Sequence, residues 1–295
     1  KICPTSGDLV SCTQRWDSPD YQVQVFDKTG KHKQTIPVSF PRKGIIHDLQ
    51  ITDNYIVIFY APAFHNLEKA MRGEDPFEWQ PQLGTKIIAI PRDGVGEQIV
   101  FETEAFFSWH FCNGYEEGGK LIIDYIWINS IPFTQAQGTG VEKQPRRMQR
   151  MTLDLKTKQV TNERFSDVFC EFSRCDERRM GKHYRYGFAA SSNRDWDDAH
   201  GYNCTGRYDF KTGETTLWEF GQGANAGEPS YVPNPDSDRE EDGWVTNFVY
   251  NPGEGAFLSI LSAGDFSSGP VCKIHIPGRV PNGFHGNWCE GLTLA

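Results

Sequence analysis

Three of the eight histidines stand in richer sequence surroundings than the others and are candidates for metal binding. His47 precedes an acidic residue and an apolar, strand-like stretch, His110 lies among aromatic residues in WHFCNGYEEG, and His285 lies in GFHGNW. Neutral imidazole is a common ligand of divalent transition metals. A solitary histidine is more often a surface or hydrogen-bonded core residue, and we assign no role to four others: His32, His65, His200 and His275. The chemistry therefore depends on whether the fold can bring the three rings together.

Short runs rich in β-branched and aromatic residues, each bounded by turn residues, predict strands along the whole chain. These runs are 21–26, 55–60, 86–90, 121–128, 151–155, 215–220, 245–250 and 256–261. No long window has a 3.6-residue period with caps at both ends, so we expect few and short helices. The sequence predicts an all-β fold.

One strand–turn–strand sequence motif recurs along the chain, as FDKTG (26–30), LDLKTK (153–158) and YDFKTG (208–213). Its aspartate can accept turn N–H groups, and glycine or lysine stands at the tip. Similar hairpins are predicted at 91–94 and 251–255. Recurring antiparallel units favour a β-propeller, in which strands from different blades line one axis, with a β-sandwich as the alternative.

Two stretches read as loops because they mix Pro, Gly and polar residues without periodicity: 130–147 and 221–243. In a propeller, such insertions collect on one face of the scaffold and often form the walls of a site.

The composition indicates a globular protein with a sizeable core, since 38% of the 295 residues are hydrophobic, and we expect a single domain over 1–295. A net charge of −9 argues against a nucleic-acid partner, because such surfaces neutralise phosphates with Lys and Arg. No stretch approaches the roughly 18 consecutive apolar residues of a membrane-spanning helix. Eight cysteines without a Cys-x-x-Cys pair predict mostly free, buried thiols and favour a cytoplasmic location.

Several segments, in order and over nearly the whole chain, resemble the signature segments of the carotenoid cleavage oxygenase family. They are HDLQIT, WQPQLGTKIIAIPRDG, WHFCNGYEEGGKLIIDY, CEFSRCDERRMGKHYRYGFAA, GEPSYVPNPDSDREEDGW and VPNGFHGNW. The resemblance implies a seven-bladed β-propeller with iron(II) on its axis, bound by four histidines. Neutral imidazoles suit iron(II), and four of them leave coordination positions open for dioxygen.

The resemblance also implies roles for individual residues. By motif, His47, His110 and His285 match three of the iron ligands. Glu171 and Glu228 match two of the glutamates that hold such ligands, and we expect Glu171 to bind His110 and Glu228 to bind His285. Taken alone, either glutamate would be read as a solvated surface residue. Three aromatic residues are candidates for a substrate tunnel, although they are as readily plain core: Trp109, Phe111 and Phe284.

The opening segment KICPTSGDL departs from the family pattern. It resembles a segment that follows the first iron-binding histidine in the family, so we expect this chain to be a C-terminal portion that lacks N-terminal strands, the fourth histidine and a third glutamate. Such a chain would leave a sheet open and bind iron poorly. If this alignment is wrong, His65 or His183 would have to be the fourth ligand.

The reaction implied by the resemblance is cleavage of a carbon–carbon double bond by O2, which gives two carbonyl products. The substrate would be a small apolar or phenolic alkene. The ending FHGNW is more similar to the stilbene-cleaving branch, with carotenoids or apocarotenoids as the alternative. A different class also stays open, namely an inactive propeller fragment that only binds or serves a structural role. The sequence does not indicate an oligomeric state.

Overall fold

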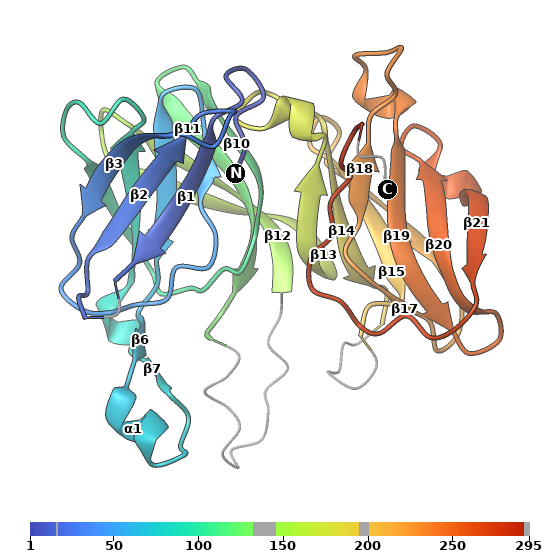
Figure 1. Ribbon diagram of the computed structural model, residues 1–295, viewed down its shortest axis with the longest axis horizontal. Coiled ribbons are helices and arrows are strands. Elements are labelled where there is room, and N and C mark those ends of the chain that lie inside the picture. The colour runs from blue at the N-terminus through green and yellow to red at the C-terminus, as the bar shows by residue number, and fades with distance from the viewer. Residues whose placement is uncertain (16, 132–145, 195–200, 292–295) are drawn as a thin grey trace. The chain divides into compact units, whose positions relative to one another are not determined.

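The computed structural model describes residues 1–15, 17–131, 146–194 and 201–291, and these residues form mostly antiparallel β structure (Figure 1). Among them, α1 (Leu67–Met71) is the only α-helix, and the remaining helical segments are short 3-10 turns. The predictions of an all-β class and of few, short helices are confirmed. The chain divides into two compact units: the first contains Lys1–Phe165 and Arg178–His183, and the second contains Ser166–Glu177 and Tyr184–Ala295.

The first unit is built from antiparallel sheets that follow one another along the chain. One sheet contains β1 (Leu9–Gln14), β2 (Tyr21–Phe26) and β3 (His32–Val38). The next contains β4 (Gln50–Ile51), β5 (Tyr55–Tyr60), β8 (Thr85–Pro91) and β9 (Ile99–Thr103). The short strands β6 (Ala63–His65) and β7 (Phe77–Trp79) form a hairpin beside α1. A further sheet begins with β10 (Phe111–Glu117), β11 (Lys120–Ile128) and β12 (Arg146–Asp154) and continues into β13 (Val160–Cys175).

Strand β5 explains how these sheets stack in the first unit. Its sequence YIVIFY is buried on both faces, which is why it reads as a continuous apolar run. Ile56 and Ile58 belong to a core cluster shared with β1 to β3, whereas Val57 and Phe59 belong to a cluster shared with β10 to β12. The sheet that contains β5 therefore lies between two other sheets.

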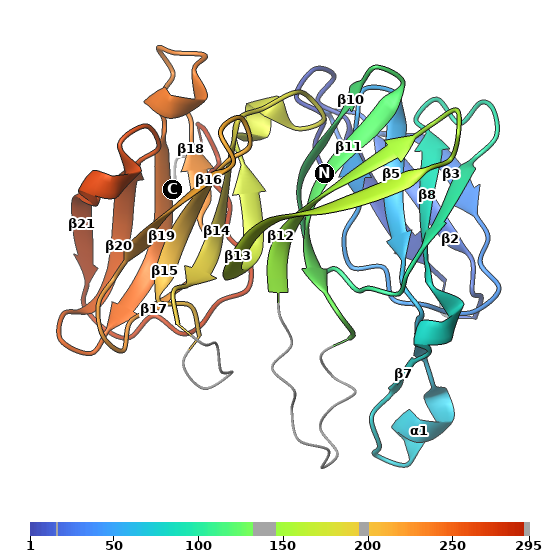
Figure 2. The ribbon, with the colours of Figure 1, turned by 180° about the vertical axis from the view of Figure 1, so that it is seen from behind.

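The second unit contains two antiparallel sheets (Figure 2). They share one hydrophobic core. The end of β13 pairs with β14 (Tyr186–Ser192), which is followed by β15 (Cys204–Asp209) and β16 (Glu214–Glu219). The other sheet contains β17 (Asn225–Ala226), β18 (Ser230–Val232), β19 (Trp244–Asn251), β20 (Gly255–Ser262) and β21 (Pro270–Ile276). Phe188 of β14 and Phe257 of β20 lie in the core cluster that joins them.

The opposite face of β19 to β21 is apolar and exposed. Phe248, Leu258 and Ile274 lie side by side across the three strands, because Phe248 pairs with Leu258 and Leu258 pairs with Ile274. Phe248 is 52% exposed, Ile274 is 50% exposed and the neighbouring Tyr250 is 39% exposed. A contiguous apolar face of this kind normally packs against another surface.

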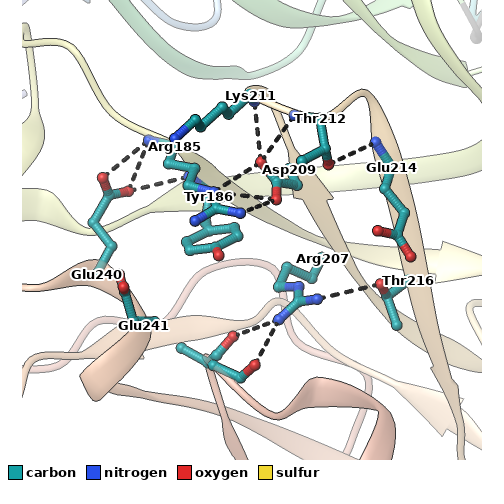
Figure 3. A network of polar contacts seen from close by, with 12 residues as sticks. Arg185, Tyr186, Arg207, Asp209, Lys211, Thr212, Glu214, Thr216, Glu240 and Glu241 are labelled. Atoms are coloured by element: carbon teal, nitrogen blue, oxygen red, sulfur yellow. Dashed lines mark hydrogen bonds and ion pairs between the residues drawn. The ribbon is translucent and has the colours of Figure 1, made fainter.

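Within the second unit, a polar network anchors the loop before β19 to β14 and β15 (Figure 3). The carboxylate of Glu240 accepts the backbone N–H groups of Arg185 and Tyr186 at 2.9–3.1 Å. The Arg185 guanidinium in turn forms a two-pronged ion pair with Asp209, with contacts of 2.7–3.1 Å. These charge-assisted bonds hold a Pro- and Asp-rich loop that has few apolar side chains of its own.

The predicted turns and strands are confirmed. In the recurring motif, the side chains of Asp27, Asp154 and Asp209 each accept two turn N–H groups at 2.8–3.3 Å. Each predicted strand coincides with or overlaps an observed strand, and the predicted hairpins at 91–94 and 251–255 join β8 to β9 and β19 to β20. The loop predicted at 221–243 contains the short strands β17 and β18, and most of the loop predicted at 130–147 lies outside the described residues.

The cysteines agree with the sequence prediction. None of the eight takes part in a disulfide, and five of them are buried: Cys3, Cys112, Cys170, Cys175 and Cys204. Among the described residues, no helix is both long enough and apolar enough to cross a membrane.

Candidate metal centre

The first unit brings two of the predicted ligands together. His47 is exposed in the segment before β4, and His110 is half-buried immediately before β10. Their ring centroids are 5.2 Å apart with an interplanar angle of 78°, and the Trp109 ring packs edge-on against His47 at 4.7 Å. Because imidazole–metal bonds are about 2 Å long, rings at this separation can donate to one ion.

The peptide group that follows His110 is fixed by hydrogen bonds at both its carbonyl and its N–H. The His110 carbonyl accepts the N–H of Ile126 on β11 at 3.0 Å. The next N–H, that of Phe111, donates to Asp48 Oδ2 at 3.1 Å, and the same oxygen accepts Lys1 Nζ at 2.8 Å. Burial alone would raise the pKa of Asp48, but the Lys1 ammonium, the Phe111 N–H and the nearby His110 hold it below its usual value. Asp48 is therefore an ionised carboxylate that joins the two histidine-bearing segments.

Two further polar contacts join the same segments. Gln50 Nε2 donates to Asn113 Oδ1 at 3.1 Å, and Thr52 Oγ1 donates to Glu116 Oε1 at 2.7 Å. Asp48, Gln50 and Thr52 alternate along the chain and so face the same side. We call the three contacts Asp48–Phe111, Gln50–Asn113 and Thr52–Glu116 the polar ladder.

Asn113 links the polar ladder to a third signature segment. Its side chain is fully buried, accepts the Gly181 N–H at 2.9 Å and donates to the carbonyls of Arg179 and Lys182 at 2.9 and 3.3 Å. Gly181 has φ +80°, which favours glycine. The segment Arg178–His183 is thus held in the first unit by a buried amide.

The second unit positions His285 by a different contact. Nδ1 of His285 lies 3.2 Å from Glu228 Oε1, and Glu228 Oε2 accepts the Gly286 N–H at 2.7 Å. The Glu228 side chain is only 4% exposed, whereas that of His285 is 50% exposed. A carboxylate acceptor at Nδ1 fixes the tautomer and leaves Nε2 as the metal-binding nitrogen. The predicted bond between Glu228 and His285 is confirmed.

Glu171 lies in the second unit beside an irregularity of β13. The pairing of β13 with β14 shifts between Glu171 and Arg174, and Phe172 between them has φ +56°. The Phe172 N–H donates to the Glu171 carboxylate, and Phe172 packs edge-on against His285 at 5.7 Å. A β-bulge that contains a non-glycine residue with left-handed backbone angles is a strained conformation, and such conformations are often found beside functional sites.

The other predicted residues have varied surroundings. Phe111 is 3% exposed and packs in the core against Phe59 at 4.5 Å, whereas Phe284 is 80% exposed. The two alternative ligand candidates each contact an aromatic ring, His65 against Phe77 and His183 against Tyr115. Of the histidines without an assigned role, His200 lies outside the described residues.

Sequence reasoning missed Asp48, Gln50 and Asn113. All three lie inside signature segments, HDLQIT and WHFCNGYEEG, so those motifs contained the available signal. Their partners are distant in sequence, and no local pattern announces such a contact.

Comparison with known proteins decides the family. The family model described as retinal pigment epithelial membrane protein (RPE65) matches residues 1–290. The chain belongs to this family, that of the carotenoid cleavage oxygenases. The sequence-based resemblance is therefore confirmed.

Similar members of the carotenoid cleavage oxygenase family are longer than this chain. It is 31% identical over 306 residues to isoeugenol monooxygenase of Pseudomonas nitroreducens, with 98% of this chain and 64% of that protein covered. It is 28% identical over 274 residues to apocarotenoid-15,15'-oxygenase of Synechocystis sp., with 90% and 56% covered. The crystal structure of Pseudomonas brassicacearum lignostilbene dioxygenase superposes with a TM-score of 0.89 at 27% identity, with 99% and 65% covered. The chain thus spans less than two thirds of each relative.

Proposed function

We propose that this chain is part of a non-haem iron(II) dioxygenase that cleaves a carbon–carbon double bond with O2 to give two carbonyl products. His47, His110 and His285 would hold the iron, and Glu171 would orient His110 as Glu228 orients His285. The observation that supports this most directly is the bond from His285 Nδ1 to the buried Glu228 carboxylate, since a carboxylate behind an imidazole is typical of metal-ligating histidine.

The donor set fits iron(II). Neutral imidazoles bind it well, and the carotenoid cleavage oxygenase family is iron-dependent. When bound, iron supplies the activation of O2, and the residues of the chain hold the metal, orient its ligands and exclude water from the substrate. Trp109, which packs against His47, is the best supported wall of the substrate tunnel, and Phe284 belongs to the same proposal, whereas the buried Phe111 packs in the core.

The proposed substrate is a phenolic alkene of the stilbene or phenylpropene type, with apocarotenoids as the second choice. Two of the similar proteins are an isoeugenol monooxygenase and a lignostilbene dioxygenase, and isoeugenol and lignostilbenes share a phenol conjugated to a carbon–carbon double bond. The ending FHGNW agrees with this preference. The substrate and O2 are the partners that this function requires.

We further propose that both units belong to one seven-bladed propeller domain that includes polypeptide beyond these 295 residues. Two observations support this: about one third of the length of two relatives lies outside the match to this chain, and the face formed by Phe248, Tyr250 and Ile274 is exposed. A propeller blade normally packs on both faces against its neighbours. Additional strands would cover this face and supply the fourth histidine.

The test compares the 295-residue chain with the same chain joined to the N-terminal part of isoeugenol monooxygenase. Iron content after anaerobic loading and aldehyde formation from a hydroxystilbene and an apocarotenoid are measured for both. We expect the joined protein to retain about one iron and to form aldehyde, and the variants His47→Ala, His110→Ala and His285→Ala to lose both, while the control His32→Gln keeps both. Iron retention without any loss in the three alanine variants would refute the ligand assignment. Iron without product would favour a protein that only binds.

A further inference from the structure

Asp48 connects the two histidine-bearing segments of the first unit through residues that are the direct sequence neighbours of the two histidines. It directly follows His47, and its Oδ2 accepts the N–H of Phe111, which directly follows His110. Its Oδ1 accepts the N–H of Leu49 at 2.8 Å, so the carboxylate is fixed at its own segment as well. The side chain is 18% exposed. One carboxylate thus binds the main chain of both segments, shortly after each histidine.

The other rungs of the polar ladder place this contact in context. Gln50–Asn113 and Thr52–Glu116 join the same two segments, two and four residues farther along the first segment and two and five along the second. These rungs set the register between the segments, whereas only the Asp48 rung lies adjacent to both histidines. A charged acceptor also forms the stronger hydrogen bond to a backbone N–H.

We infer that Asp48 is a positioning residue whose bond to the Phe111 N–H fixes the spacing of His47 and His110, so that both rings can serve one metal ion. The metal part of this inference rests on the proposed function, whereas the spacing of the rings does not. Small displacements of ligand rings are costly, because metal–nitrogen distances must be met within a few tenths of an ångström.

The experiment uses the whole chain and two measurements. The first is the cross-peak between the ring protons of His47 and His110 in NMR spectra of the metal-free protein, assigned with single His→Gln variants. The second is the affinity for Co(II), followed by absorption titration. Asp48→Ala removes the contact, and Asp48→Asn keeps an oxygen that can accept the Phe111 N–H. The matched controls are Thr52→Val, which removes the far rung, and Lys1→Met, which removes the ion pair but leaves the Phe111 contact.

We expect Asp48→Ala to lose the ring cross-peak and to weaken Co(II) binding about 10–100-fold. Asp48→Asn should recover most of both, and the two controls should retain both even if they unfold at lower temperature. If Asp48→Ala matches Thr52→Val in both measurements, the inference is overturned. If neither the unaltered chain nor the chain joined to the N-terminal part of isoeugenol monooxygenase takes up Co(II), the proposed metal site fails, and the cross-peak alone still decides the role of Asp48.

Discussion

The two units hold their candidate ligands in different ways. His110 is fixed through its main chain, because its carbonyl and the following N–H are bound by Ile126 and Asp48 at the start of a buried strand. His285 lies in an exposed segment after β21 and is fixed through its ring and the adjacent N–H by one carboxylate, Glu228. A ligand built into a strand shares the global stability of its sheet, whereas a ligand on a loop depends on a local contact.

Among the substitutions considered, Asp124→Ala should weaken most strongly the strands that hold His110. Asp124 is fully buried on β11 opposite Asn113, and it binds Arg150 through two contacts of 2.8 Å. Asp124→Ala removes one partner of a buried ion pair, so we expect the free energy of unfolding to fall by about 3–5 kcal/mol. The contact between His47 and His110 should be lost only as the first unit unfolds. Urea denaturation measures the effect.

The control for Asp124 is the exposed pair of Lys86 and Glu102 in the same unit, 3.4 Å apart. Glu102→Ala should cost less than about 1 kcal/mol, since such pairs are solvent-screened. Equal losses in the two variants would mean that the buried pair does not support β10 and β11.

Glu228→Ala tests the second arrangement. We expect a weakening of Co(II) binding by about 10–100-fold and faster exchange of the Gly286 amide, because both bonds to the carboxylate disappear. The urea midpoint should change much less than in Asp124→Ala, since His285 lies in an exposed segment. A loss of stability as large as that of Asp124→Ala would show that both ligands depend on global packing, and the contrast between the units would fail.

The recurring turn allows a comparison of the same aspartate in the two units. Asp27 in the first unit is half-buried and accepts the N–H groups of its turn, whereas Asp209 in the second also binds Arg185 and is 7% exposed. Burial alone would raise the pKa of Asp209, but Arg185 and the turn N–H groups hold it below its usual value. The stability that this carboxylate contributes is therefore present above its unfolded pKa of about 3.9 and is lost as pH falls through the lower folded pKa.

Asp209→Asn should accordingly lower the free energy of unfolding by about 1 kcal/mol at pH 7. The difference from the unaltered protein should shrink as pH falls below about 4. Asp27→Asn is the matched control and should have the smaller effect at every pH. Denaturant titrations at several pH values decide the matter, and a difference that stays constant down to acid pH would contradict the role of the ion pair.

The smallest expected effect concerns the tip of that turn. Lys158 has φ +60° where Gly213 stands at the equivalent position of the second unit with φ +78°. Lys158→Gly relieves a strained backbone but adds entropy to the unfolded chain, so we expect a net stabilisation of less than about 1 kcal/mol. Lys156→Gly, two residues earlier and without positive φ, should be slightly destabilising. Thermal unfolding of both variants measures this, and a higher unfolding temperature for Lys156→Gly than for Lys158→Gly would contradict the prediction.

The strands that could be predicted were those with an unbroken local signal. The runs at Tyr21–Phe26 and Tyr55–Tyr60 coincide with β2 and β5, because alternation or continuous apolarity marks buried strands. Strand β10 was missed because Asn113 and Gly114 within FCNGYEE are typical of turns. The buried side-chain amide of Asn113 forms hydrogen bonds with residues 179–182, which are far away in sequence, and a local pattern cannot reveal such contacts.

The candidate site divides in the same way. The motifs indicated the histidines and the Glu228–His285 bond, since both partners lie in signature segments. They did not indicate Asp48, which reads as an ordinary polar residue until its partner at Phe111 is known. Phe111 itself was proposed for the tunnel because it is an aromatic residue within a ligand motif, and its side chain lies in the core.

The return of the chain to the first unit at Arg178–His183 constrains the order in which the protein can fold during synthesis. The first unit is interrupted after Phe165. The residues that form hydrogen bonds with the Asn113 side chain are therefore synthesised only after part of the second unit has been synthesised. At about 5–20 residues per second, the ribosome needs about 1–4 s to add residues 166–183. For that interval the amide of Asn113 has no native carbonyls from this segment to bind. A ribosome that pauses within this stretch would therefore prolong the life of an incomplete first unit, the form that chaperones are most apt to capture.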